Sequence, residues 1–279
     1  MTAFKAACVQ LRSGLDPAAN VAAACELIEE AAAQGASLVA TPEMTHVVDL
    51  RPRRLCGVIA EEDRTEALTT FRDLAARLNI WLLIGSLAVK LGERRAANRS
   101  FLIAPSGVVA ARYDKLHMFD VDLDGGESYR ESNVYQAGAA AVVAHTPSCV
   151  LGLSICYDVR FPHLYRALAR AGASVMAVPA AFTRQTGEAH WHVLLRARAI
   201  ETGSFVIAPA QGGRHEDGRE TFGHSLIVDP RGRVLAEKDD DAPGFVLAEI
   251  RPEEAEAARR RIPNLGVDTP FQIQQIDAS

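Results

Sequence analysis

The sequence predicts an α/β protein, a four-layer αββα sandwich in which two stacked sheets are related by a pseudo-twofold axis. Two observations predict this fold. Short apolar runs alternate with longer helical patterns, and segments of the first half recur in the same order in the second half. The recurring pairs are 34–42 with 171–179, 80–83 with 205–208, and 100–107 with 225–232. Three matches in one order indicate two similar halves, each a mixed sheet with helices on one face.

Boundary residues support the elements of the first half. Asp16 supplies an N-cap and Gly35 a stop for the first helix, and residues 105–107 (Pro-Ser-Gly) form the turn of a hairpin. The expected elements are a strand over 4–11, a helix over 17–34, a strand over 36–43, a helix over 66–79, a strand over 80–89 and a hairpin over 100–115.

The second half repeats this alternation and then ends without a regular pattern. The expected elements are a strand over 150–157, a helix over 162–171, a strand over 174–180, a helix over 190–201, a strand over 204–210 and a hairpin over 224–239 with its turn at 229–232. We expect residues 1–262 to form a single domain. Residues 263–279 lack periodicity, so we expect a C-terminal arm that either frays or lies on a partner subunit.

Composition and charge exclude several classes of protein. Of the 279 residues, 48% are hydrophobic and 23% are charged, which is typical of a globular chain and not of a disordered one. The net charge of −5 argues against a nucleic acid or an anionic membrane as partner. No apolar run approaches the ~20 residues that span a bilayer, and the first residues read as a strand instead of a targeting segment.

The cysteines indicate a reducing compartment. There are five, at positions 8, 25, 56, 149 and 156, and they are widely spaced with no CxxC motif. This pattern favours neither a disulfide framework nor a thiolate zinc site. We therefore expect reduced thiols, most of them buried, and a cytoplasmic location.

Three chemically active side chains directly follow apolar strands. Glu43 closes "SLVATPE", Lys115 closes "VVAARYDK" and Cys156 closes "LGLSICYD". Ligands of open α/β sheets collect at the carboxyl ends of strands, so these side chains can converge. An acid, an amine and a thiol suffice for acyl transfer.

Each of the three would have a defined role in that chemistry. Cys156 would form a thioester, and Lys115 with the backbone N–H of Tyr157 would make the oxyanion hole. Glu43 would move protons in both half-reactions. Each residue also has a purely structural explanation, as a packed thiol, a loop carboxylate or N-cap, and a solvated strand end.

Four segments of the chain resemble a known family. They are "TPEM" (41–44), "RYDKLHMFD" (112–120), "GLSICYDVRFP" (152–162) and "AHWHVLLRARAIE" (189–201), in the order and spacing of the nitrilase superfamily of carbon–nitrogen hydrolases. The resemblance extends from Lys5 to about Ile250. Residues 186–202 and 211–232 resemble most the amidases that act on deaminated glutathione, with ω-amidase beside them.

The resemblance implies a nitrilase-like αββα fold with a catalytic triad of Glu43, Lys115 and Cys156. It also implies that a second glutamate, Glu131, positions the lysine and the substrate amide. Members of the family usually form dimers through helices beside the cysteine strand, so a homodimer or higher homo-oligomer with crossing C-terminal arms is expected. Many relatives carry Glu where this chain has His163, and we expect that change to affect dimer contacts or local pairing more than the chemistry.

Four residues near the cysteine are candidates for substrate binding. An acidic protein needs a local cation to hold an acidic substrate, and the Arg160 guanidinium suits a carboxylate. The alternative is that Arg160 pairs with Asp158 or with a helix end. Phe182 and Thr183 follow the strand over 174–180 and would face the same mouth, and Tyr157 contributes its N–H.

Other polar segments remain open. The arginine-rich loop 45–55 either covers the site or is a solvated charge run. His190 and His192 lie two apart on a helix, point about 200° apart and cannot share one ion. The sequence assigns no role to His215 or to His224. There is no HExxH, GxGxxG or Walker motif, so we expect neither a metal nor a cofactor.

These patterns predict a cysteine-dependent amidase that hydrolyses a small carboxylate-bearing amide to an acid and ammonia through a thioester. A nitrilase, an N-carbamoyl amidase or an ammonia-channelling synthetase domain would use the same scaffold, although no ATP-binding domain is fused here. A non-catalytic binding protein that retains the fold is a further alternative. A glutamine amidotransferase of the nucleophile-elbow type is disfavoured, because it needs Gly where Asp158 stands and a late His-x-Glu.

Overall fold

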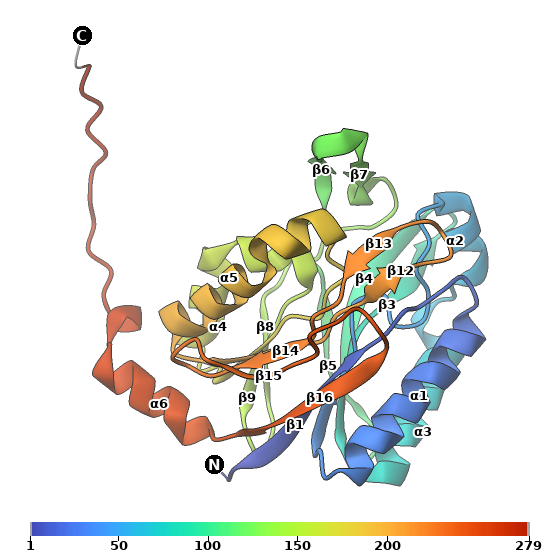
Figure 1. The fold of residues 1–279 in the computed structure, drawn as a ribbon, viewed down its shortest axis with the longest axis horizontal. Coiled ribbons are helices and arrows are strands. Elements are labelled where there is room, and N and C mark those ends of the chain that lie inside the picture. The colour runs from blue at the N-terminus through green and yellow to red at the C-terminus, as the bar shows by residue number, and fades with distance from the viewer. Residues whose placement is uncertain (1, 278–279) are drawn as a thin grey trace.

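Two six-stranded sheets are stacked face to face, with helices on both outer faces, in the computed structural model, which describes residues 2–277 (Figure 1). The predicted layer order αββα is therefore confirmed. Helices α1 (Pro17–Ala33) and α3 (Glu66–Leu78) cover one sheet, and α4 (Pro162–Arg170) and α5 (Arg184–Thr202) cover the other. As expected, Asp16 caps α1, because its Oδ1 accepts a hydrogen bond from the Ala18 N–H at 2.9 Å.

The first sheet has the strand order β16-β1-β2-β3-β4-β5. Strands β1, β2 and β3 are parallel to one another, while β16, β4 and β5 pair antiparallel with their neighbours. The bounds are β1 Phe4–Gln10, β2 Leu38–Ala40, β3 Trp81–Gly92, β4 Arg95–Ile103, β5 Val109–Asp114 and β16 Gly244–Ile250.

The second sheet, with the order β8-β9-β10-β11-β14-β15, repeats the same pattern of directions. Its bounds are β8 Val142–His145, β9 Val150–Leu153, β10 Val175–Ala177, β11 Phe205–Ala208, β14 Leu226–Val228 and β15 Val234–Glu237. The three sequence repeats fall on β2 and β10, β3 and β11, and β4 and β14. The pseudo-twofold relation predicted from the sequence is thus confirmed strand by strand.

Alternating side chains of the strands fill two different cores. In β1, Ala6 and Cys8 are buried between the two sheets, whereas Ala7 and Val9 pack with the helices of the outer face. The sheets approach each other closely near Gly85 in β3, where an added Cβ would lie 2.0 Å from the Thr41 carbonyl oxygen and 2.4 Å from the Pro179 Cβ. A glycine is therefore required where the loops of the two halves meet.

Several short elements were not predicted from the sequence. They are the strands β8 and β16, the helices α2 (Pro52–Val58) and α6 (Pro252–Arg261), the hairpin of β6 (Asp120–Asp122) and β7 (Ser128–Arg130), and the hairpin of β12 (Gly212–Arg214) and β13 (Glu220–Phe222). Single 3-10 turns cover η1 Glu62–Arg64, η2 Asp124–Gly126, η3 Glu131–Asn133, η4 Cys156–Arg160 and η5 Asn264–Gly266. The turns, the two hairpins and α2 are too short to show a period of apolar residues. Helix α6 consists of charged residues and alanines after Pro252, so no stripe of large apolar side chains marks it. Strands β8 and β16 lie outside the repeated segments.

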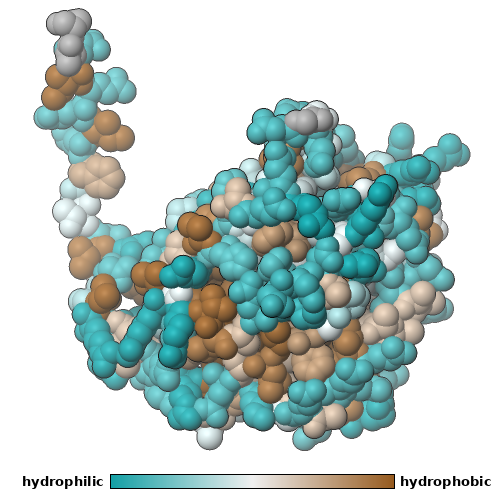
Figure 2. Space-filling view, viewed as in Figure 1, coloured by the Kyte–Doolittle hydropathy of each residue, from teal (hydrophilic) through white to brown (hydrophobic). Residues whose placement is uncertain are grey.

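The C-terminal segment leaves the body of the protein after α6 (Figure 1). Arg166 of α4 holds its beginning by donating to the Val267 carbonyl oxygen at 2.7 Å, and Arg170 pairs with Asp268 at 2.6 Å. Farther along, Phe271 is 85% exposed, and apolar side chains stand out along the segment in Figure 2. The division into a domain over 1–262 and an arm over 263–279 stays a prediction, and its residues 1, 278 and 279 lie outside the described part.

No helix among residues 2–277 is both long enough and apolar enough to cross a membrane.

Candidate active site

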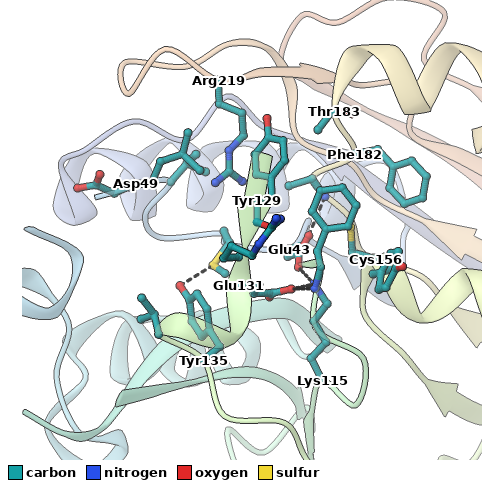
Figure 3. Close-up of a pocket in the computed structure, with 18 of the residues that line it drawn as sticks. Glu43, Asp49, Lys115, Tyr129, Glu131, Tyr135, Cys156, Phe182, Thr183 and Arg219 are labelled. Atoms are coloured by element: carbon teal, nitrogen blue, oxygen red, sulfur yellow. Dashed lines mark hydrogen bonds and ion pairs between the residues drawn. The ribbon is translucent and has the colours of Figure 1, made fainter. Parts of the chain in front are cut away.

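Glu43, Lys115 and Cys156 line one cavity of about 310 Å³ (Figure 3). Glu43 lies in the turn after β2, Lys115 directly follows β5, and Cys156 lies after β9 in the other sheet. All three are at least 93% buried, with exposed fractions of 4%, 2% and 7%. The structure therefore brings together the three side chains that were expected to converge, at the junction of the two halves.

Lys115 bridges two carboxylates. Its Nζ lies 2.9 Å from Glu43 Oε1 and 2.8 Å from Glu131 Oε2. Asn98 Nδ2 donates to the same pair, to Glu43 Oε1 at 2.9 Å and to Glu131 Oε1 at 3.1 Å. Glu131 is fixed in turn by the Phe119 N–H at 2.7 Å. The predicted second glutamate is thus in direct contact with the lysine.

A backbone N–H from the second half and a sharp turn in the first half hold Glu43 in place. Its Oε2 accepts a hydrogen bond from the Ala181 N–H, in the loop after β10, at 2.9 Å. The next residue, Met44, has a left-handed φ of 55°, and its N–H donates to Ser86 Oγ at 2.9 Å. This sharp turn aims the carboxylate into the cavity instead of along the strand.

Cys156 lies in a strained turn and not in a strand. The strand expected over 150–157 ends at Leu153, and Cys156 begins the turn η4 with a left-handed φ of 51°. Its N–H donates to the Pro179 carbonyl oxygen at 2.8 Å. A non-glycine residue in this region is costly, and such strain is concentrated at functional sites.

Asp158 connects the cysteine turn to the segment that carries Lys115. It is fully buried, and its Oδ2 accepts from the Ile155 N–H at 2.9 Å and from the Tyr113 hydroxyl at 2.6 Å. Its Oδ1 accepts from the His117 N–H at 3.1 Å and lies 2.6 Å from His117 Nδ1. The suggested pairing of Arg160 with Asp158 is therefore wrong, because four other donors occupy this carboxylate.

Electrostatics set the resting charges of the three central groups. Burial alone would lower the pKa of Lys115, but the charges of Glu131 and Glu43 raise it well above its usual value. Burial alone would raise the pKa of Glu43, but Lys115 holds it below its usual value. Burial and the Glu43 charge raise the pKa of Cys156, and Lys115 offsets them only in part. The resting site is a thiol, a carboxylate and an ammonium.

The four predicted substrate contacts, Tyr157, Arg160, Phe182 and Thr183, all line the same cavity. The Arg160 guanidinium stacks on the Tyr157 and Phe182 rings, 5.9 and 5.4 Å from their centroids. The Thr183 hydroxyl caps α5 by accepting from the Thr186 N–H at 3.3 Å. The sequence did not indicate this N-cap contact of Thr183.

The loop 45–55 covers the site with some residues and exposes charges with others. Val48, Asp49 and Leu50 line the cavity, so the loop covers the site. Arg51 and Arg53 are exposed, whereas Arg54 pairs with Asp49. The arginines of this loop are therefore solvated or paired, and its apolar residues face the cavity.

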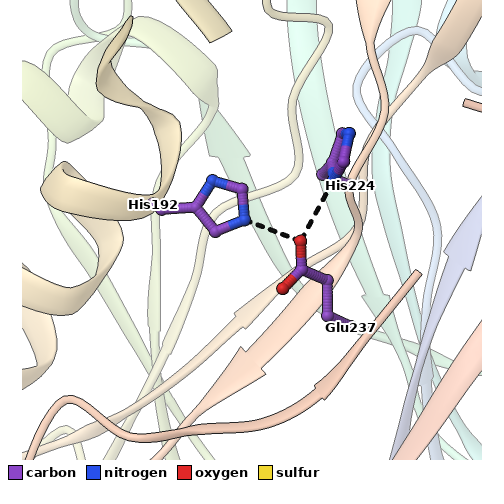
Figure 4. Close-up of side chains that lie close together, drawn as sticks. All are labelled: His192, His224 and Glu237. Carbon is purple, nitrogen blue, oxygen red and sulfur yellow. Dashed lines mark hydrogen bonds and ion pairs between the residues drawn. The ribbon is translucent and has the colours of Figure 1, made fainter. Parts of the chain in front are cut away.

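His190 and His192 point to different partners, as their spacing on the helix predicts. His190 faces Arg160, with its Nδ1 3.3 Å from Nη2, whereas His192 faces Glu237 (Figure 4). His192 Nε2 and His224 Nδ1 lie 2.7 and 3.0 Å from the same Glu237 oxygen. This cluster is the group among residues 2–277 whose ligand atoms, all within 4.8 Å of one another, could hold a metal ion. None of the three lines the cavity of Cys156.

His163 and His215 have structural contacts. His163 lies on the exposed first turn of α4 and meets the His117 ring edge-on at 5.9 Å, away from the cavity lining. His215 is buried and lies 2.8 Å from the Ser13 carbonyl oxygen and 2.7 Å from Thr221 Oγ1. It therefore fixes the β12–β13 hairpin to the loop after β1.

Sequence reasoning missed four residues of the site: Asn98, Tyr129, Asp158 as a connecting carboxylate, and Arg219. Asn98 lies outside the hairpin expected over 100–115, and its complete burial in β4 is known only from the structure. Tyr129 and Arg219 gave no signal, because they lie on or beside short hairpins that carry no pattern.

Comparison with known proteins agrees with this geometry. Residues 5–260 match the family model described as carbon–nitrogen hydrolase. A deaminated glutathione amidase of Synechocystis sp. is 44% identical over 269 residues, which cover 95% of this chain and 98% of that protein.

Solved structures show the same fold. The Caenorhabditis elegans NitFhit protein superposes with a TM-score of 0.87 at 36% identity over 95% of this chain, which spans 64% of that longer chain. An amidase variant from Nesterenkonia sp. AN1, whose active-site cysteine carries the acetamide moiety of fluoroacetamide, superposes with a TM-score of 0.78 at 27% identity, covering 92% of this chain and 94% of that one. This chain belongs to the carbon–nitrogen hydrolase family, within the nitrilase superfamily, and is a hydrolase acting on C–N bonds.

Proposed function

We propose that the chain is an amidase that cleaves a carboxylate-bearing amide through a thioester on Cys156. The observation that supports this most directly is the convergence of Glu43, Lys115 and Cys156 in one cavity. The thiol adjoins a carboxylate that can take its proton and an ammonium that can stabilise an oxyanion. A non-catalytic scaffold would have no need to bury a carboxylate and an ammonium beside a thiol at the cost of desolvation.

In the first half-reaction, Glu43 takes the thiol proton as the sulfur attacks the amide carbonyl carbon. The developing oxyanion is held by Lys115 and by the Tyr157 N–H. Glu43 then gives the proton to the departing nitrogen, the C–N bond breaks, and a thioester and a free amine or ammonia result. Because Cys156 rests as a thiol, the proton transfer and the attack are coupled, and Glu131 keeps the lysine charged and in place.

In the second half-reaction, Glu43 removes a proton from a water molecule that attacks the thioester. The tetrahedral intermediate uses the same oxyanion hole, and its collapse breaks the C–S bond. The proton returns from Glu43 to the sulfur, and the carboxylic acid leaves. The enzyme is regenerated without a redox change. Glu43 relays each proton, from the thiol to the departing nitrogen and then from water to the sulfur.

The substrate we propose resembles deaminated glutathione or an ω-amide of a keto acid. The similar Synechocystis protein is a deaminated glutathione amidase. Arg160, which lies over two aromatic rings at the cavity, offers a guanidinium for the carboxylate of the acyl part. With a primary amide the nitrogen leaves as ammonia, and with an N-substituted amide it leaves as an amine.

The proposed function is tested by assaying deaminated glutathione, α-ketoglutaramate, glutamine and a simple nitrile. We expect turnover of the first two, and loss of nearly all of it in Cys156→Ala but not in Cys25→Ala, which removes a partly exposed thiol elsewhere. Intact mass during turnover should show an acyl adduct that maps to Cys156. Activity on the nitrile alone, or full activity of Cys156→Ala, would refute the proposal.

We also propose a cytoplasmic homodimer in which the arm over 263–279 crosses to the other subunit. The five cysteines, all free, support the reducing compartment. On α5, Val193 and Ile200 are 67% and 51% exposed, and along the arm Phe271 and Ile273 are 85% and 83% exposed. A second copy of the chain would cover these side chains. Light scattering of the full chain and of a chain ending at residue 262 should give a dimer only for the former.

A further inference from the structure

A guanidinium that does not belong to the cysteine turn also lines the cavity. Arg219 lies in the loop between β12 and β13, and it lines the cavity beside Tyr129 (Figure 3). Its Cζ is 5.9 Å from the centroid of the Tyr129 ring. Arg160, by contrast, lies four residues after Cys156 and stacks on Tyr157 and Phe182. Three guanidinium groups therefore line the cavity: Arg160 near the nucleophile, Arg219 on a separate hairpin, and Arg130, which an aspartate already neutralises.

Arg219 lacks a partner, although neighbouring arginines have one. Arg54 pairs with Asp49, and Arg130 pairs with Asp122 at 2.7 Å. Within residues 2–277, no carboxylate forms an ion pair with Arg219, and its Nε is buried without a hydrogen-bond partner. A buried N–H that bonds to nothing is costly, which indicates that a ligand supplies the acceptor.

The loop that carries Arg219 is fixed in place before any ligand arrives. Asp217 accepts hydrogen bonds from the Arg219 N–H at 3.0 Å and from the Leu50 N–H at 2.9 Å, which connects the loop to the cover over the cavity. At the base of the hairpin, Phe222 packs so closely on α5 that a Cβ on Gly187 would lie 2.2 Å from it. A guanidinium on a preorganised loop loses little conformational entropy on binding.

The planar fork of arginine matches a carboxylate, and the cavity itself already holds the two carboxylates of Glu43 and Glu131 beside a single lysine. The two carboxylates of a doubly negative substrate would therefore bind to arginines at the rim. Only its amide would reach the two glutamates in the interior. Since the acyl part stays on Cys156, the guanidinium near that residue suits the acyl carboxylate. Arg219 is then left for the departing amine.

We propose that Arg219, with Tyr129 beside it, forms a subsite for a carboxylate on the leaving-amine side of the substrate. This inference rests on the proposed function and specifies its substrate class: amides with one carboxylate on the acyl part and another at the far end of the amine part. Arg160 holds the first carboxylate and Arg219 the second. An amide whose amine part ends in a neutral group uses only the first subsite.

The test compares deaminated glutathione with its C-terminal carboxamide, which has the same shape but no charge at that end. For the unmodified enzyme we expect kcat/KM to be about 10- to 100-fold higher for the acid, the range of one charged hydrogen-bonded pair. In Arg219→Gln this preference should fall to about onefold, mainly through KM, and Arg219→Lys should restore part of it. Arg214→Gln, which removes an exposed arginine from the same hairpin, should keep the full preference.

Each alternative result has a distinct meaning. Equal kcat/KM for the two substrates in the unmodified enzyme would overturn the subsite while leaving the amidase intact. An equal loss for both substrates in Arg219→Gln would also overturn it, because it would show a structural role. If the unmodified enzyme cleaves neither amide, the proposed function fails, and the subsite fails with it.

Discussion

Replacing Asp158 with asparagine removes a buried charge while keeping the shape of the side chain. The carboxylate accepts from four donors: the N–H groups of Ile155 and His117, the Tyr113 hydroxyl and the His117 ring. An asparagine has one oxygen and one NH₂ group, so its NH₂ must face two of these donors. The hydroxyl can turn and the ring can change tautomer, but in either orientation one backbone N–H faces another donor.

The cost follows from these contacts. One buried N–H without an acceptor costs about 1–3 kcal/mol, and each hydrogen bond that loses its charged acceptor weakens by about 1 kcal/mol. Asp158→Asn should therefore destabilise the protein by about 3–5 kcal/mol, within the ~5–15 kcal/mol that folded domains have. Because the same side chain fixes the turn of Cys156 and the segment after Lys115, kcat should fall as well.

Urea unfolding gives the free energy of unfolding, and steady-state kinetics on deaminated glutathione gives kcat. The matched control is Asp229→Asn, a buried carboxylate that accepts from the N–H groups of Arg231 and Arg233 in a hairpin turn remote from the cavity. We expect it to lower stability and leave kcat unchanged. A loss below about 1 kcal/mol in Asp158→Asn, or an equal drop of kcat in the control, would refute the reasoning.

Two further predictions concern charge. Glu43→Gln should lower kcat by about 10²–10⁴-fold, because the proton acceptor is lost. It should also lower the pKa of the Cys156 thiol, because a negative charge beside the sulfur is gone. The rate of iodoacetamide alkylation, measured against pH, reports this pKa, and a higher midpoint than in the unmodified enzyme would contradict the prediction. Burial alone would raise the pKa of Glu237, but hydrogen bonds from His192 and His224 hold it below its usual value. Its carboxylate therefore stabilises the fold above the ordinary glutamate pKa, and the contribution is lost as pH falls through the lowered value. Urea midpoints should show Glu237→Gln less stable by about 1 kcal/mol or less at neutral pH, with the difference shrinking in acid; a constant difference would contradict the assignment.

The sequence predicted the larger features because they have long-range patterns. The repeated segments located β2 with β10 and β3 with β11, and the strand ends located Glu43, Lys115 and Cys156. Alternation and repetition are visible in one dimension, since burial of a sheet face imposes them on the residues. These features could therefore be read before any coordinates.

The remaining features depend on contacts between distant residues. That Asp158 binds Tyr113 and His117 instead of Arg160 follows from how the two sheets stack. The position of Arg219 depends on a hairpin of two three-residue strands, which carry no period. No local pattern encodes such distances, so these parts required the three-dimensional structure.

Because the nucleophile and its partners come from different halves of the chain, the enzyme stays chemically inert during much of its own synthesis. Glu43, Lys115 and Glu131 leave the ribosome first, without a sulfur to activate. Cys156 emerges later, and the sheet that carries Glu43 gains its last edge strand, β16, only when residue 250 has been added. A chain that ends before Cys156 therefore has no thiol with which to attack an amide, and one that ends before β16 lacks an edge strand of the sheet that carries Glu43.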